Sequence, residues 1–217
     1  IGIQLAHAGR KASTHVPWQG SQPLKPEEGA YATVSSSAVP FAEGWHTPTA
    51  LDRAGLARVR DDFVMAAKRA DRLGIDLVEL HAAHGYLMQQ FLSPLVNRRS
   101  DDYGGSLANR MRFPLEVFAA VRAAWPTGKP LGARINGTDW VDGGWSIEDA
   151  VIFARALQER GADYVCVSGG ATVGTAKIPI GPGYMVPLAQ RVKRETGLAT
   201  RAVGMIVSPG DTLRTVI

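Results

Sequence analysis

The feature that most constrains the fold is a repeated alternation of short apolar segments with longer amphipathic ones. Five apolar segments have the length and composition of buried strands: residues 1–7, 75–80, 131–135, 162–168 and 199–205. Each is followed by a helical pattern, in two cases after a long excursion, over residues 8–50 and 81–110. Parallel strands need long crossover connections, which are usually helices. The order therefore predicts an α/β fold with a parallel sheet covered by helices.

Helical spacing and end signals predict helices over residues 51–73, 112–125, 146–160 and 184–196, and a last helix from Ser208. Asp52 is suited to cap the first of these helices. Ser146 and Asp149 fit a capping box. Gly74 and Gly161 follow helical segments and suit the left-handed position after a helix end.

Two closures of such a sheet are open at this point: a doubly wound sheet and a barrel. A complete (β/α)8 barrel typically needs about 250 residues and eight strands, whereas this chain has 217 residues and five predicted strands. Ile1 lies inside an apolar strand-like run and Ile217 inside a helical-looking one. On the barrel interpretation we therefore expect an incomplete barrel, with residues 1–217 forming one partial domain.

Composition excludes several classes of function. Hydrophobic residues make up 45% of the chain, charged residues 20%, and the net charge is +4. The basic residues are scattered, so no nucleic-acid-binding face is indicated. No apolar run has the length of a membrane span. The single cysteine, Cys166, lies in an apolar run and is interpreted as a core residue. It permits no intrachain disulfide, which fits a cytoplasmic protein.

Polar residues and glycines recur at the carboxyl ends of the predicted strands, where α/β folds place their sites. They are Gln4, His7, His81, His84, Tyr86, Arg134, Ser168 and Gly204. The histidine pair and Tyr86 form the sharpest local motif. Two neutral imidazoles can bind one ligand oxygen, and a tyrosine hydroxyl can act as a general acid. A metal site and a buried structural cluster are the alternatives.

Arg134 lies within an apolar strand, where a guanidinium needs either an anionic or polar ligand or a salt bridge, for example to Glu79. The amide of Gln4 could pair with the edge of a heterocycle or tie strands together. Gly204 allows a ligand to approach the backbone closely or simply satisfies a turn. The chain contains neither a Rossmann glycine motif after a strand nor a P-loop.

Three segments carry a resemblance to a known family. Residues 89–113 (QQFLSPLVNRRSDDYGGSLANRMRF) directly follow an H-x-x-H-G-Y element and are similar to the signature segment of the old yellow enzymes. Residues 4–12 (QLAHAGRKA) resemble the third-strand motif of the bacterial xenobiotic-reductase branch, and residues 203–206 (VGMI) its seventh-strand motif. The resemblance implies a (β/α)8 TIM barrel covering about strands 3 to 7, with the N-terminal strands and the C-terminal strand missing.

The resemblance also implies a function: an FMN-dependent ene-reductase that reduces activated alkenes with NADPH or NADH. It implies that Gln4, Arg134 and Gly204 contact FMN, and that His81 and His84 bind the substrate oxygen. Tyr86 would then protonate the substrate, and residues 97–112 would be mainly structural. A homodimer is expected from the same branch.

Two other functions remain in view. One is a relative of the dienoyl-CoA reductases on the same fold. The other is a barrel fragment that binds no flavin, because the family's phosphate-gripping Gly-Arg pair would follow in the missing eighth strand.

Overall fold

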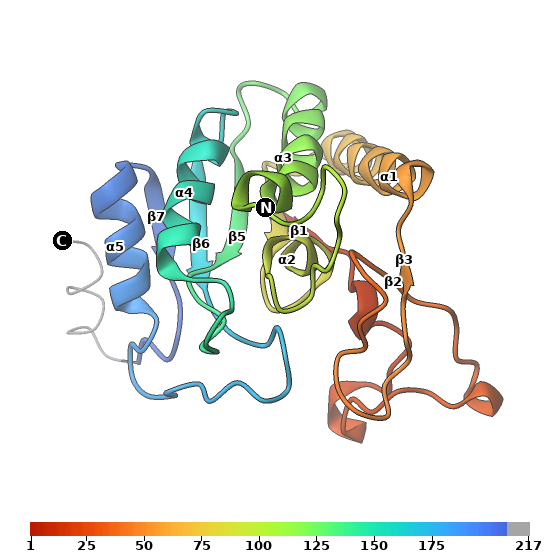
Figure 1. Cartoon of the computed structure of the whole chain (residues 1–217). Helices are drawn as coiled ribbons and strands as arrows, with labels where there is room; N and C mark the ends of the chain where they lie inside the picture. Colours follow the sequence, from red (N-terminus) through yellow and green to blue (C-terminus); the bar gives the residue numbers. More distant parts are fainter. Residues whose placement is uncertain (208–217) are drawn as a thin grey trace.

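The structure is a computed structural model and describes residues 1–207. Its centre is a parallel sheet of five strands, in the order β1-β4-β5-β6-β7 (Figure 1). These strands are β1 (Gly2–Leu5), β4 (Leu77–Ala82), β5 (Leu131–Asn136), β6 (Tyr164–Ser168) and β7 (Ala199–Ala202). The predicted parallel sheet is confirmed. Spatial order follows chain order throughout, whereas a doubly wound sheet reverses its order. The arrangement is therefore the arc of a barrel.

Four long helices pack on one face of the sheet, and Figure 1 shows them side by side. They are α1 (Arg53–Arg72), α3 (Leu107–Ala124), α4 (Ile147–Gln158) and α5 (Val186–Thr196). The largest buried side chains of the core include Trp125, Trp145, Phe113, Phe118 and Phe153. Within the described part of the chain, no helix has both the length and the apolar character needed to cross a membrane.

Several element boundaries differ from those predicted. Helix α3 begins at Leu107 rather than at residue 112, because the Ser106 hydroxyl accepts a hydrogen bond from the Asn109 amide and caps an earlier turn. A short helix, α2 (Leu87–Leu92), lies where only an excursion was predicted. Strand β7 ends at Ala202 rather than at residue 205. The predicted helix from Ser208 lies outside the described residues.

The excursion over residues 8–50 is held to the barrel by a buried arginine. It contains three short 3₁₀ turns and a two-strand parallel ribbon of β2 (Val34–Ser35) and β3 (Thr49–Ala50). Arg10 is 1% exposed. Its guanidinium donates to the carbonyls of Val39 and Pro40 within the excursion and to that of Thr172 after β6. The excursion therefore lies beside the loops that follow the strands (Figure 1).

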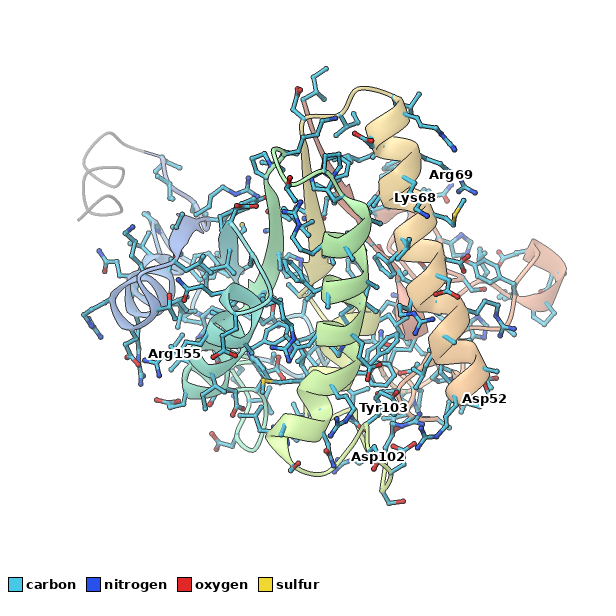
Figure 2. All side chains as sticks on the ribbon, turned by 90° about the horizontal axis from the view of Figure 1, so that it is seen from above. Asp52, Lys68, Arg69, Asp102, Tyr103 and Arg155 are labelled. Atoms are coloured by element: carbon cyan, nitrogen blue, oxygen red, sulfur yellow. The ribbon has the colours of Figure 1, made fainter. Side chains whose placement is uncertain are left out.

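The predicted caps give a first test of this fold. Asp52 accepts a hydrogen bond from the Gly55 amide at 2.7 Å, at the start of α1 (Figure 2). We predict that Asp52→Ala lowers the free energy of unfolding by about 1 kcal/mol, because a helix N-terminal N–H loses its partner. Urea unfolding measures this difference. Lys68→Ala, an exposed change on the same helix, should stay within about 0.5 kcal/mol. Equal losses for the two variants would contradict the assigned cap.

Candidate active site

Alternate residues of the strands lie on two chemically different faces of the sheet. One set belongs to the core beneath the helices: Val78, Leu80, Ala82, Leu131, Ala133, Ile135, Val165 and Val167. The intervening positions carry polar groups on the opposite face: Gln4, Glu79, His81, Arg134, Cys166 and Ser168. Side chains alternate between faces along a strand. The register then pairs His81 with Arg134 on neighbouring strands.

The structure brings His81, His84 and Tyr86 together at the carboxyl end of β4. The ring centroid of His81 lies 5.0 Å from that of His84 and 4.8 Å from that of Tyr86. The Nδ1 atom of His81 accepts a hydrogen bond from the Ala83 amide at 3.2 Å. In a neutral imidazole the proton must then be on Nε2, so His81 can donate that hydrogen to a ligand. The Nε2 atom of His84 lies 2.7 Å from the Ser168 hydroxyl.

Burial keeps both imidazoles neutral. It lowers the pKa of His81 to about 4, and the positive charge of Arg134 contributes in the same direction. The same two causes lower the pKa of His84 to about 3. Near neutral pH both rings are therefore uncharged and suited to hydrogen bonding with a carbonyl oxygen.

Arg134 has no carboxylate partner among the described residues. Its Nη2 donates to the Ser168 hydroxyl at 3.3 Å, and its Nε is buried without a hydrogen bond. The alternative of an Arg134–Glu79 salt bridge is wrong, since Glu79 pairs with Arg201 from β7. A half-buried guanidinium with unused donors fits a site for an electron-rich group.

Gln4 lies on the same polar face and hydrogen-bonds to Glu79. Its Nε2 donates to Oε1 of Glu79 at 2.6 Å, across the β1–β4 pair. The sequence left two roles open for this amide: contact with a heterocycle and a link between strands. The structure contains the link between strands. This bond leaves the carboxamide oxygen and the second N–H available to a ligand.

A cavity of about 440 Å³ adjoins the carboxyl ends of the strands. Four of the predicted site residues line it: His84, Tyr86, Arg134 and Gly204. His81 and Gln4 do not. Gly204 has a φ of +102°, and a Cβ there would lie 3.1 Å from side-chain atoms of Tyr184 and Met185. A side chain at this position would therefore meet both conformational strain and crowding.

A buried polar network that the sequence analysis missed fixes the backbone of His84. The Oδ1 atom of Asn136 accepts from the His84 amide at 3.0 Å, and its Nδ2 donates to Gly170 O and Asp139. Asp139 and Asn136 are both 0% exposed. Asp139 also accepts hydrogen bonds from Gln89, Ser93, Thr172 and the Trp145 amide. His84 needs such support because its φ of +57° is left-handed.

One signal for this network was available in the sequence. Asn136 directly follows the predicted strand of residues 131–135, where a polar side chain at a strand end indicates a site. Asp139 gave no such signal, because its partners come from segments far apart in the chain. Among residues 1–207, no three His, Cys, Asp or Glu side chains gather as a candidate metal site.

Comparison with known proteins identifies the family. The sequence matches the NADH:flavin oxidoreductase / NADH oxidase family over residues 1–216. It is 43% identical over 208 residues to an NADPH dehydrogenase of Geobacillus sp. (strain WCH70), covering 96% of this chain and 56% of that protein. A Listeria monocytogenes (serotype 4a, strain HCC23) NADPH dehydrogenase is 42% identical, with 94% and 55% covered. The chain thus spans about half the length of these relatives.

Solved structures agree on the fold. Morphinone reductase superposes with a TM-score of 0.71 at 29% identity, covering 99% of this chain and 58% of that one. A 2-naphthoyl-CoA reductase complex gives a TM-score of 0.82 at 24% identity, covering 97% and 33%. The chain belongs to the NADH:flavin oxidoreductase / NADH oxidase family. The predicted resemblance to old yellow enzymes is confirmed, and so is the incomplete TIM barrel.

The neutral histidines predict a dependence of stability on pH. Unfolding returns both pKa values to about 6.5, from about 4 and about 3 in the folded protein. Below pH 6.5 the unfolded chain then binds protons that the folded chain does not, so stability falls as pH falls toward 4. NMR titration of the imidazole Cε1 protons should show both rings neutral at pH 5. Titration of either ring near pH 6.5 in the folded protein would contradict this.

The Asn136 network predicts a local effect at His84. We predict that Asn136→Ala speeds hydrogen exchange of the His84 amide and lowers the free energy of unfolding by about 1–3 kcal/mol, because a buried N–H loses its acceptor. Thr172→Val is the matched control, since it removes the hydroxyl that donates to Asp139 and accepts from Asn136 Nδ2 at 3.4 Å, but leaves the Asn136–His84 bond. Equal exchange rates for His84 in the two variants would contradict the assigned role.

Proposed function

We propose that the protein is an FMN-dependent oxidoreductase that uses NADPH or NADH to reduce activated C=C bonds of α,β-unsaturated carbonyl compounds. The observation that carries the proposal is the cluster of two neutral histidines and Tyr86 beside the Arg134 guanidinium, which has no carboxylate partner within residues 1–207. Family membership and the NADPH dehydrogenase relatives support it.

The residues present fit FMN at the carboxyl ends of the strands. Arg134 has a buried Nε without a hydrogen bond in the described structure and lines the cavity. It would stabilise negative charge on the pyrimidine side of the reduced ring, and Gln4 would contact the same side through its amide oxygen. Gly204 would let the cofactor approach the backbone. FMN, when bound, supplies the hydride for the β-carbon.

The chain's own groups would perform the rest of the reaction. His81 and His84 hydrogen-bond the carbonyl oxygen of the substrate, which draws electron density away from the alkene. Each neutral imidazole still carries one N–H that it can donate. Tyr86 then delivers its hydroxyl proton to the α-carbon as a general acid. Hydride and proton together saturate the double bond, and the same cavity would accept the nicotinamide in the other half of the cycle.

The two alternatives differ in what they would show. The likeness to 2-naphthoyl-CoA reductase, at 24% identity, supports a shared fold only. It does not support a CoA substrate for this chain. A non-catalytic fragment would lack a flavin absorbance band. We also propose a cytoplasmic location, because the single buried Cys166 permits no intrachain disulfide. We propose a homodimer because the family branch is expected to dimerise.

The function is tested with the full-length protein loaded with FMN and reduced anaerobically with NADPH. Addition of 2-cyclohexenone should restore the oxidised flavin spectrum and yield cyclohexanone. A reduced flavin that stays reduced over many equivalents of 2-cyclohexenone would contradict the proposal, and a protein that binds no flavin would favour the non-catalytic alternative.

The role of Tyr86 is tested by Tyr86→Phe. We predict that reoxidation by 2-cyclohexenone slows by about 10²- to 10⁴-fold, because the general acid is gone. Reduction of the flavin by NADPH should be much less affected, since it needs no proton from this hydroxyl. Stopped-flow absorbance separates the two half-reactions, and equal slowing of both would indicate a structural role instead.

A further inference from the structure

A second cavity of about 700 Å³ lies next to the candidate active site. Lys11 and Tyr86 line both cavities, so the second cavity adjoins the one that His84 lines. The second cavity is formed mainly by the excursion over residues 8–50. Its aromatic lining includes Tyr31, Phe41 and Trp45, and the rings of Phe41 and Trp45 pack edge to face with centroids 4.7 Å apart.

Lys11 is fixed at the boundary between the two cavities. Its Nζ donates to the carbonyls of His84 and Ala171, each at 3.0 Å. The same atom lies 4.6 Å from the ring centroid of Phe41 and 5.2 Å from that of Tyr86. An ammonium group has three donors, so these two hydrogen bonds leave one N–H for a ligand.

The described part of the chain provides no carboxylate to neutralise the charge of Lys11. No Asp or Glu lines either cavity, and no carboxylate forms an ion pair with Lys11 within residues 1–207. Burial lowers the pKa of Lys11 to about 8, and the neighbouring Arg10 contributes in the same direction. The other basic group at the second cavity, His15, already contacts a carboxylate oxygen of Glu28 at 3.4 Å. An anion beside Lys11 would therefore gain a partly desolvated and unshared positive charge.

We propose that the second cavity is a subsite for an anionic group at the remote end of the substrate, and that Lys11 selects it. The inference rests on the proposed function. It narrows the substrate class to α,β-unsaturated carbonyl compounds that carry a carboxylate beyond an apolar spacer. The carbonyl oxygen binds His81 and His84, the spacer passes Tyr86, and the carboxylate accepts the remaining N–H of Lys11.

The test compares 4-carboxycinnamaldehyde with its methyl ester, which has the same spacer but no charge. We expect the wild-type protein to have a higher kcat/KM for the acid. Lys11→Met should lower the ratio of acid to ester by about tenfold, the effect of losing one partly buried charge pair. Lys11→Arg should retain most of the ratio, because a positive charge remains.

Lys68→Met is the control, since Lys68 is exposed on α1 and lines neither cavity (Figure 2). It should leave the ratio unchanged. A ratio unaffected by Lys11→Met, or equal losses for acid and ester, would overturn the subsite and leave Lys11 a structural residue.

If Lys11→Met does not fold, binding to the wild-type protein still tests the proposed subsite. A calorimetric Kd of the oxidised protein for 4-carboxycinnamaldehyde that is no tighter than that for its methyl ester would overturn the inference. Failure of the proposed function has a different signature, because then neither the acid nor the neutral ester would be reduced.

Discussion

Alternation along a parallel strand is the constraint on which the site depends. Val78, Leu80 and Ala82 of β4 pack beneath the helices, so Glu79 and His81 must lie on the other face. Parallel pairing then sets His81 beside Arg134. The same packing that stabilises the fold thus collects polar side chains in the barrel interior. Burial there lowers the pKa of both imidazoles and keeps them neutral. An imidazole exposed to solvent would lack this effect.

A second layer of polar contacts makes that cluster specific. The Asp139–Asn136 network joins α2, the end of β5 and the loop after β6, and it ends on the His84 amide. The left-handed backbone of His84 costs about 1 kcal/mol or more. The hydrogen bond that the His84 amide donates to Asn136 and the one that the His84 carbonyl accepts from Lys11 offset this cost. The backbone of His84 is therefore held at both its amide and its carbonyl.

The sequence was informative where interactions are local. The parallel sheet, the caps at Asp52 and Ser146, and the clustering of His81 with Tyr86 follow from periodicity and short spacing, and the structure contains them. Asp139 and Lys11 escaped prediction because their partners lie in distant segments. Periodicity cannot show such long-range pairs. The early start of α3 had a local cause at Ser106 that the pattern of apolar residues concealed. The flavin contacts of Gln4, Arg134 and Gly204 remain predictions.

The central claim is that His81 and His84, as neutral donors, bind and polarise a carbonyl oxygen. The most direct measurement is the ¹³C chemical shift of carbonyl-labelled 2-cyclohexenone bound to the full-length protein with oxidised FMN. The account predicts a downfield shift relative to the free ketone in water, and its loss when both histidines are replaced by alanine. A bound ketone whose carbonyl shift matches that in water, or one unaffected by removing both imidazoles, would contradict it.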